Sequence, residues 1–281
     1  MADNRRTVLS WVWPPPPIAG RLWVAVAAAA GYSALVYALP TAEVLHPVWS
    51  SQFALWNTAI LGLLVSFRTK VAYDRWWEAR ILWGSLVNNS RNLCLKAREL
   101  ARPDAAERRA FAGLVAGFAV ALMRHLRGAA RLSEVSGFEK QSKDPRHVPA
   151  FLAGALMETV AAWRAAGRID GHTHQMLDVN LNALMDICGA CERIRNTPLA
   201  PSYLSLLRHG LVLGFLVTPW ALVQVLGAWA IGVQALAVYF LFGIELTAEA
   251  VEQPFGLDGD DLALETYCET IRTSADDILG Q

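Results

Sequence analysis

The chain has 281 residues, of which 54% are hydrophobic and 18% charged, and its 25 basic and 25 acidic residues give a formal net charge of zero. A soluble domain carries about 25% charged residues, and the shortfall comes from two stretches, residues 22–67 with one charge and residues 209–244 with none. This distribution excludes an ordinary soluble enzyme, a disordered chain and a nucleic-acid binder with a strongly basic surface, and it indicates a membrane protein with a substantial aqueous domain.

The first apolar block predicts two membrane-spanning helices, at about residues 22–39 and 53–67. As a helix, the first segment would be about 27 Å long, enough to cross the hydrocarbon core of a bilayer, and Pro40 would end it. Residues 1–21 precede it with three arginines and are predicted to be a cytosolic N-terminal segment. A cleaved secretory signal is the alternative for the first helix, but its length and aromatic content argue against cleavage.

Residues 68–208 have an ordinary charged composition and predict a helical cytosolic domain. Residues 48–102 contain no proline, so the second spanning helix can continue past the membrane. Apolar residues then recur at helical spacing over 111–126, 151–166 and 176–194. Since no long run alternates between apolar and polar residues as a strand would, the predicted fold class is all-α.

The second apolar block, residues 209–244, is too long for one span and predicts a helical hairpin that turns near Gly227. Residues 245–281 follow as an acidic C-terminal segment with a net charge of −9, against +8 for residues 68–208. We therefore expect this tail to fold back against the helical domain, of its own or of a neighbouring subunit. Lys and Arg mark the cytoplasmic side of a membrane protein, and their clustering before the first span, after the second and before the third predicts four spans with both termini in the cytoplasm.

Three separated motifs resemble those of the bestrophin family. The first is the segment 67–80, Phe-Arg-Thr-Lys-Val-Ala-Tyr-Asp-Arg-Trp-Trp-Glu-Ala-Arg, which includes Arg75, Trp76 and Glu78. The second is Cys191-Glu192-Arg193 with Thr197-Pro198, and the third is Glu252-Gln253-Pro254-Phe255-Gly256 with Asp260-Asp261-Leu262. The first motif alone could be an interfacial anchor, because Trp and Arg favour the membrane–water boundary. All three occur in the family's order, so the chain is identified as resembling a bacterial bestrophin.

The resemblance implies a homopentameric ion channel in the bacterial inner membrane, with four transmembrane helices per subunit around one axial pore for small monovalent ions. In the family, the second membrane helix lines a hydrophobic neck with three rings of large apolar residues at i, i+4 and i+8. Counting back from Arg75 assigns the neck to Ala59, Leu63 and Phe67. Ala59 is smaller than the family pattern expects, so its ring would be wider.

Two further sites follow from the resemblance. A second, cytosolic constriction lies about nineteen residues before the Cys-Glu-Arg motif, which gives His172. A ring of histidines would titrate near neutral pH, whereas the alternative is an exposed loop histidine. Eukaryotic relatives bind Ca²⁺ with acids after Pro-Phe-Gly, and Asp258 and Asp261 match that pattern best. The alternative is a solvated acidic turn that pairs with cytosolic arginines.

Two other functions remain open at this point, a membrane-embedded metal-dependent enzyme that uses this acidic cluster and a non-conducting scaffold. Ion flux through the purified protein would separate a channel from both. Selectivity is also open, because eukaryotic bestrophins pass chloride, bacterial relatives have been associated with sodium and potassium, and an apolar neck by itself prefers neither charge.

Overall fold

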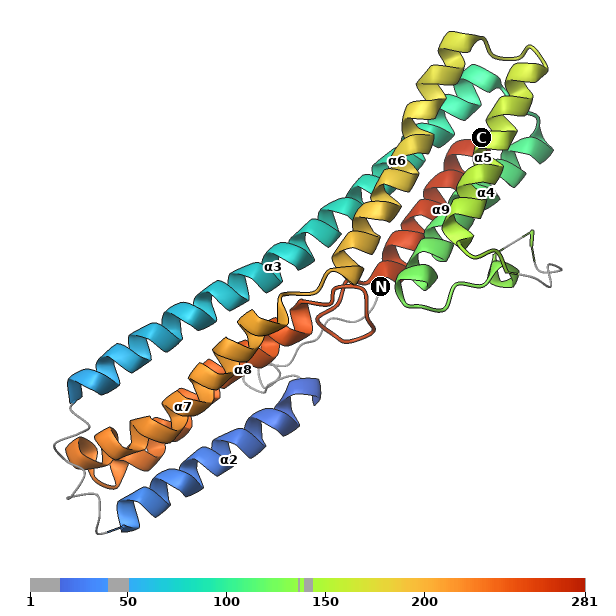
Figure 1. Ribbon diagram of the computed structural model, residues 1–281. Coiled ribbons are helices and arrows are strands. Elements are labelled where there is room, and N and C mark those ends of the chain that lie inside the picture. Colours follow the sequence, from blue (N-terminus) through green and yellow to red (C-terminus); the bar gives the residue numbers. More distant parts are fainter. Residues whose placement is uncertain (1–15, 40–50, 136, 139–143, 281) are drawn as a thin grey trace. The chain divides into compact units, whose positions relative to one another are not determined.

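The computed structural model describes residues 16–39, 51–135, 137–138 and 144–280 (Figure 1). Pro40, the residues 41–46 that follow the first predicted span, and most of the N-terminal segment lie outside these residues. Within the described ranges every regular element is helical, which confirms the all-α prediction. The α-helices are α2 (Pro16–Ala38), α3 (Ser51–Lys96), α4 (Ala105–Leu126), α5 (Val148–Ala165), α6 (Gly171–Asn196), α7 (Pro201–Leu226), α8 (Trp229–Val251) and α9 (Leu264–Gly280).

The chain divides into two compact units, each described here by itself. The first comprises residues up to Asp74, Leu199–Glu252 and Asp258–Asp260. The second comprises Arg75–Pro198, Gln253–Leu257 and the residues from Asp261 onward. Because the boundary falls after Asp74, α3 contributes its first half to one unit and its second half to the other.

In the first unit, α2, α7 and α8 pack side by side (Figure 1). The predicted hairpin is confirmed, since α7 ends at Leu226 and α8 begins at Trp229. Gly227 caps α7 with a φ of +54°, in the region that favours glycine over residues with a side chain. Gly227 is therefore at the turn of the hairpin, as the sequence predicted.

A proline inside α7 explains a buried polar residue in α8. Pro219 has no N–H, so the carbonyl of Phe215 lacks its usual helical donor. The side-chain Nε2 of Gln234 donates a 3.2 Å hydrogen bond to that carbonyl. Because an unpaired carbonyl is costly in an apolar environment, the α8 amide compensates for the α7 proline.

The first half of α3 packs on α7 through aliphatic side chains and one glycine. Leu61 and Val65 form an apolar cluster with Leu207 and Leu211. A Cβ at position 214 would overlap the Leu61 side chain, so glycine is needed there for the helices to approach closely.

Four helices in the described residues are long and apolar enough to cross a membrane: α2, α4, α7 and α8. Three of them correspond to predicted spans. Of the apolar window of α4, 56% is buried within the protein, against 17% for α2, 22% for α7 and 28% for α8. The apolar residues of α4 thus serve the core of the second unit.

The predicted second span lies in α3, which is outside that set of four. Polar residues such as Asn57 and Thr58 interrupt its apolar stretch, and Arg68 follows directly. Membrane insertion of residues 53–67 therefore stays a prediction, which is taken up with the function below.

In the second unit, α4, α5, α6, α9 and the second half of α3 surround one core. Its largest fully buried side chains include Trp83, Phe111, Phe118, Leu122, Leu152 and Leu177. Asp104 starts α4 with a capping box that it shares with Glu107, and it accepts hydrogen bonds from the backbone at 106 and 107. These caps satisfy N–H groups that a helix start leaves without partners.

The acidic tail folds back onto the helical unit of its own chain. One apolar stripe of α9, which consists of Leu264, Cys268, Ile271, Ala275 and Leu279, is buried against this unit. Glu265 also pairs with Arg127. The expected docking is thus present, but its main contact is apolar and not ionic.

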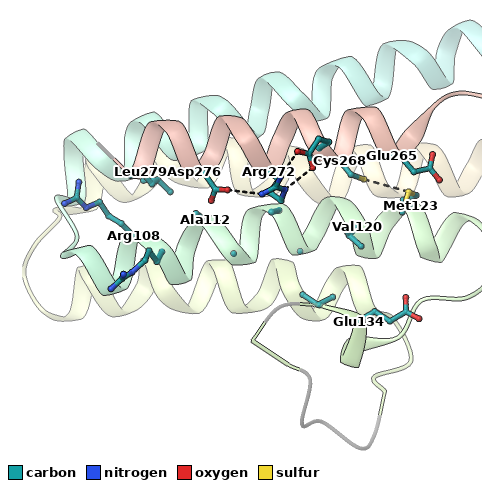
Figure 2. Close-up of a pocket in the computed structure, with 17 residues that line it drawn as sticks. Arg108, Ala112, Val120, Met123, Glu134, Glu265, Cys268, Arg272, Asp276 and Leu279 are labelled. Carbon is teal, nitrogen blue, oxygen red and sulfur yellow. Dashed lines mark hydrogen bonds and ion pairs between the residues drawn. The ribbon is translucent and has the colours of Figure 1, made fainter. Parts of the chain in front are cut away.

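An open groove of about 770 Å³ runs along α4 and α9 (Figure 2). Its floor contains the small residues Ala112, Gly113 and Gly117. On its rim, Arg272 pairs with Glu269 on the same helix, so the positive charge of this arginine is balanced within α9.

Candidate functional site

The three predicted neck residues share one exposed face of α3. A step of four residues keeps side chains on one side of a helix. Leu63 is 58% exposed, Phe67 is 55% exposed and Ala59 is exposed as well. Leu61 and Val65, which lie two residues before Leu63 and Phe67 and on the opposite face of the helix, are only 4% and 3% exposed. Within one chain, α3 therefore presents an apolar face with large unburied side chains.

The residue after this face is a buried arginine. Arg68 has a fully buried side chain whose Nη2 donates a 2.7 Å hydrogen bond to Glu252, and its Nε lies 3.5 Å from Glu245. Glu252 also accepts a 3.4 Å hydrogen bond from the backbone N–H of Leu199. A charge removed from water requires such partners. The cluster therefore fixes α3 against α8. It also sets the direction in which the face with Leu63 and Phe67 points.

In the second unit, the first and second sequence motifs meet. Arg75 donates hydrogen bonds of 2.6 Å to the carbonyls of Thr197 and Ile194, at the C-terminal end of α6. Such a cation satisfies carbonyls that a helix end leaves unpaired. Glu78 accepts a 2.8 Å hydrogen bond from Arg193, and Trp76 packs against the core. These signature residues hold the helical unit together.

The Pro-Phe-Gly part of the third motif makes a compact turn in the same unit. Pro254 and Phe255 are buried, and the Phe255 carbonyl accepts a 3.1 Å hydrogen bond from Arg127. A Cβ at Gly256 would lie 2.6 Å from the carboxylate of Asp261, so the close approach of that carboxylate requires glycine. This packing explains the Pro-Phe-Gly sequence without invoking a ligand.

The predicted calcium ligands fall in different units. Asp258 is exposed and belongs to the first unit, whereas Asp261 belongs to the second. Calcium coordination by this pair stays a prediction.

His172 lies in the first turn of α6 and is exposed. Asp170 caps this helix by accepting a 2.7 Å hydrogen bond from the backbone N–H of Thr173. That hydrogen bond, with a smaller contribution from the charge of His172, lowers the pKa of the Asp170 carboxyl. His172 is therefore on a capped helix and not in a loop, and its place in a cytosolic constriction stays a prediction.

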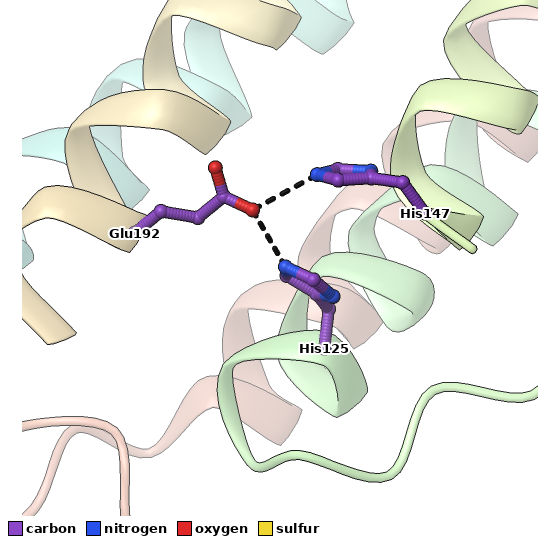
Figure 3. Close-up of side chains that lie close together, drawn as sticks. All are labelled: His125, His147 and Glu192. Atoms are coloured by element: carbon purple, nitrogen blue, oxygen red, sulfur yellow. Dashed lines mark hydrogen bonds and ion pairs between the residues drawn. The ribbon is translucent and has the colours of Figure 1, made fainter. Parts of the chain in front are cut away.

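A cluster that the sequence did not single out joins three elements of the second unit (Figure 3). One carboxylate oxygen of Glu192 lies 2.6 Å from Nε2 of His125 and 2.9 Å from Nε2 of His147. Burial raises the pKa of Glu192, but the hydrogen bonds with the two histidines act in the opposite direction, and the net pKa is below its ordinary value. The ionised carboxylate thus accepts from both rings.

The three ligand atoms of this cluster lie within 4.8 Å of one another, a spacing that could hold a metal ion. However, Nδ1 of His147 accepts a 3.0 Å hydrogen bond from the N–H of Ala150 and caps α5. A metal-bound histidine instead carries a proton on its other ring nitrogen and donates it. The cap therefore fits a neutral His147 that donates to Glu192 better than a metal ligand.

The four cysteines are free and buried. Burial raises the pKa of Cys188 and of Cys191 to about 12. Both therefore remain thiols at neutral pH, whereas zinc is bound by thiolates.

Comparison with known proteins agrees with the motifs. Residues 12–277 match the sequence model of the family described as bacterial/fungal bestrophin protein. A voltage-dependent anion channel-forming protein of Nostoc sp. is 35% identical over 233 residues, which cover 78% of this chain and 74% of that protein. One from Synechocystis sp. is 29% identical over 280 residues, which cover 94% of this chain and 87% of that protein.

Solved structures match the fold. A crystal structure of a bacterial bestrophin homologue from Klebsiella pneumoniae has a TM-score of 0.85 at 21% identity, and the match covers 93% of this chain and all of that chain, 100%. A second structure of the homologue, phased with zinc, has a TM-score of 0.82 at 23% identity, with coverage of 93% and 98%. The arrangement of helices is therefore shared over almost the whole length.

Proposed function

The chain belongs to the bacterial and fungal bestrophin family, and on that premise we propose that it forms an anion-selective membrane channel, with five copies around one axial pore. The names of its curated relatives, which are anion channel-forming proteins, support a channel over the enzyme and scaffold alternatives. They also support anions over sodium or potassium as the permeant ions.

The exposed apolar face of α3 is the observation that carries the proposal. Leu63 and Phe67 are large, apolar and more than half exposed in the single chain. Leaving such apolar side chains in water would cost free energy. In a ring of five copies they would form two stacked apolar collars, with Ala59 as a wider third ring. Such a collar holds water poorly and offers no ligand to replace the hydration of an ion, so it limits ion flow.

This assignment also accounts for the composition of α3. A helix that lines a pore contacts lipid on only part of its surface, so it does not need the uniform apolarity of α2, α7 and α8. Asn57, whose Nδ2 donates a 3.4 Å hydrogen bond to Thr218, satisfies part of its polarity within the unit. We infer that residues 53–67 of α3 cross the membrane beside the pore.

The orientation follows from charge. Arg21 near the start of α2 and Arg208 near the start of α7 mark the same end of the first unit as the acidic end of α8. Arginines concentrate on the cytoplasmic side, so we infer an inner-membrane protein with cytoplasmic termini.

A reversal potential tests the proposal directly. The purified protein is reconstituted in a planar bilayer with a gradient of potassium chloride. A reversal near the chloride equilibrium potential supports an anion channel, whereas a reversal near that of potassium contradicts anion selectivity. Absence of any ion flux would contradict the channel and would favour a non-conducting alternative such as a scaffold. Native mass spectrometry tests the assembly, since the proposal requires the mass of five chains of 30.8 kDa.

A further inference from the structure

A cavity of about 560 Å³ lies within the first unit, between α2, α7 and α8. Most of its wall is apolar. The lining includes Ala25, Ala28 and Ala29 of α2, Val212, Phe215 and Leu216 of α7, and Val238 and Phe242 of α8. The small residues of α2 leave the space open, and the aliphatic and aromatic side chains of the other helices would contact a hydrocarbon chain.

One end of the cavity is charged. Arg21 lies 3.2 Å from Glu249, and Arg208 lies 3.4 Å from Glu249 and 3.7 Å from Glu245. The two arginine side chains are 60% and 51% exposed, so they remain accessible from outside the protein. This end therefore offers both signs of charge, two guanidinium groups and two carboxylates.

Glu245 is the unusual member of this group. It lines the cavity and is 2% exposed, yet neither of its carboxylate oxygens accepts a hydrogen bond within the described structure. Its nearest cations, Arg68 at 3.5 Å and Arg208 at 3.7 Å, balance its charge without donating to it. A carboxylate can accept several hydrogen bonds, and leaving a buried acceptor unpaired is costly. The cavity thus lacks a hydrogen-bond donor at this position.

The far end of the cavity lies in the middle of the membrane helices. The hydroxyl of Tyr32 donates a 3.0 Å hydrogen bond to the carbonyl of Leu216, and both residues line the cavity. From Arg21 to Tyr32 is about 16 Å along α2. This is roughly half of the hydrocarbon thickness of a bilayer, which is about 30 Å. The cavity therefore has the length of one leaflet.

We propose that this cavity binds a phospholipid with a primary ammonium headgroup, such as phosphatidylethanolamine, from the leaflet on the arginine side. The ammonium donates hydrogen bonds to Glu245, the phosphate accepts from Arg21 and Arg208, and one acyl chain lies against the small residues of α2. A zwitterionic headgroup leaves the balance of two arginines and two carboxylates unchanged, whereas an anionic headgroup would add a net negative charge and would bring no donor to Glu245. The inference rests on the membrane location of α2, α7 and α8 and not on ion conduction.

The test compares three lipids with identical acyl chains on the delipidated, detergent-solubilised oligomer, with bound lipid counted by native mass spectrometry. Phosphatidylethanolamine should bind about tenfold more tightly than phosphatidylcholine, because hydrogen bonds to a charged group are strong and a quaternary ammonium has no N–H to donate. Phosphatidylglycerol should also bind more weakly. Equal binding of the ethanolamine and choline lipids, or preferential binding of phosphatidylglycerol, would overturn the proposal.

One pair of tryptophan variants and one variant of Glu245 locate the site. Ala28→Trp fills the apolar part of the cavity and should abolish the preference for phosphatidylethanolamine, whereas Ala27→Trp, at an exposed neighbouring position outside the lining, should keep it. Glu245→Gln should reduce the preference for phosphatidylethanolamine. Because Glu245 also lies next to the buried Arg68, this variant could unfold the first unit, and the two tryptophan variants provide a test that does not depend on it. If Ala28→Trp binds the ethanolamine lipid as the wild type does, the cavity is not the site. Because binding is measured without flux, its failure is distinguishable from failure of the channel proposal.

Discussion

Arg68 of α3 and Glu252 at the end of α8 form a 2.7 Å ion pair whose side chains are 0% and 10% exposed. Arg68 directly follows the last proposed neck residue, and Glu252 begins the third sequence motif. Two motifs separated by most of the chain are thus joined at the base of the proposed neck. Because the pair fixes the rotation of α3 about its axis, it determines which side chains of α3 face the proposed neck.

Removal of the Arg68 charge should destabilise the first unit strongly. Arg68→Met removes the cation that pairs with the buried Glu252 and one of the two cations near Glu245. Breaking a buried pair in this way costs about 3–5 kcal/mol. Lys70→Met is the matched control on the same helix, because Lys70 pairs with Asp74 at an exposed position, where a pair is worth about 0–1 kcal/mol. Thermal unfolding of the purified oligomer measures both. Similar melting temperatures for the two variants would show that the buried pair does not clamp α3.

The Glu192 cluster should make the second unit sensitive to acid. The folded-state pKa of Glu192 is lowered, so the stability that it contributes is present above its unfolded pKa, about 4.3, and is lost as pH falls through the folded value. Glu192→Gln should therefore flatten the loss of stability on acidification below about pH 5. Glu158→Gln, at an exposed position of α5, serves as the control. An unchanged acid profile in Glu192→Gln would mean that the two histidines do not stabilise the carboxylate.

His172 should make conductance depend on pH if five copies form the cytosolic constriction. Positive charges around a narrow opening would change anion current, and histidine is the side chain that generally gains such a charge on acidification from about pH 8 to 5.5. The measurement compares the wild type with His172→Ala over this range. The account expects a pH response that the variant lacks, and a flat response in both would remove His172 from the pore.

The acidic tail should depend on apolar packing and only weakly on salt. Ile271 is 1% exposed in the α9 stripe, so Ile271→Ala should cost about 2–5 kcal/mol. Arg272→Ala, which removes an exposed ion pair within α9, should lower the stability much less than Ile271→Ala does. Melting temperatures in low and high salt measure both variants. Dissociation of α9 by salt, with little effect of Ile271→Ala, would favour ionic docking instead.

The sequence alone predicted the helices that are apolar along their whole length. The spans in α2, α7 and α8 and the turn at Gly227 follow from long apolar runs and a glycine break. Residues 53–67 of α3 and the whole of α4 show the limit of this reasoning. Apolarity alone does not distinguish a helix buried in a protein core, such as α4, from one in lipid. A helix that contacts lipid on only part of its surface, as proposed for α3, has an interrupted apolar run.

The clusters of charged residues were not predictable in the same way. His125, His147 and Glu192 come from different helices or their caps, and no periodic pattern links them. Arg68 was part of a recognised motif, but its partners Glu245 and Glu252 lie far along the chain. A signal was present in Glu245, an acid at the end of a long apolar run, because an ionisable residue at that depth needs a partner.

The conductance of neck variants tests the central claim most directly. Leu63→Ala and Phe67→Ala are each compared with wild type in planar bilayers, and Leu236→Ala on α8 is the control, because Leu236 is 56% exposed and close in exposure to Leu63 at 58%. If the collars of Leu63 and Phe67 limit ion flow, each neck variant widens an apolar ring and raises current, while the control leaves it unchanged. Unchanged current in both neck variants would contradict the assignment of this face of α3 to the pore.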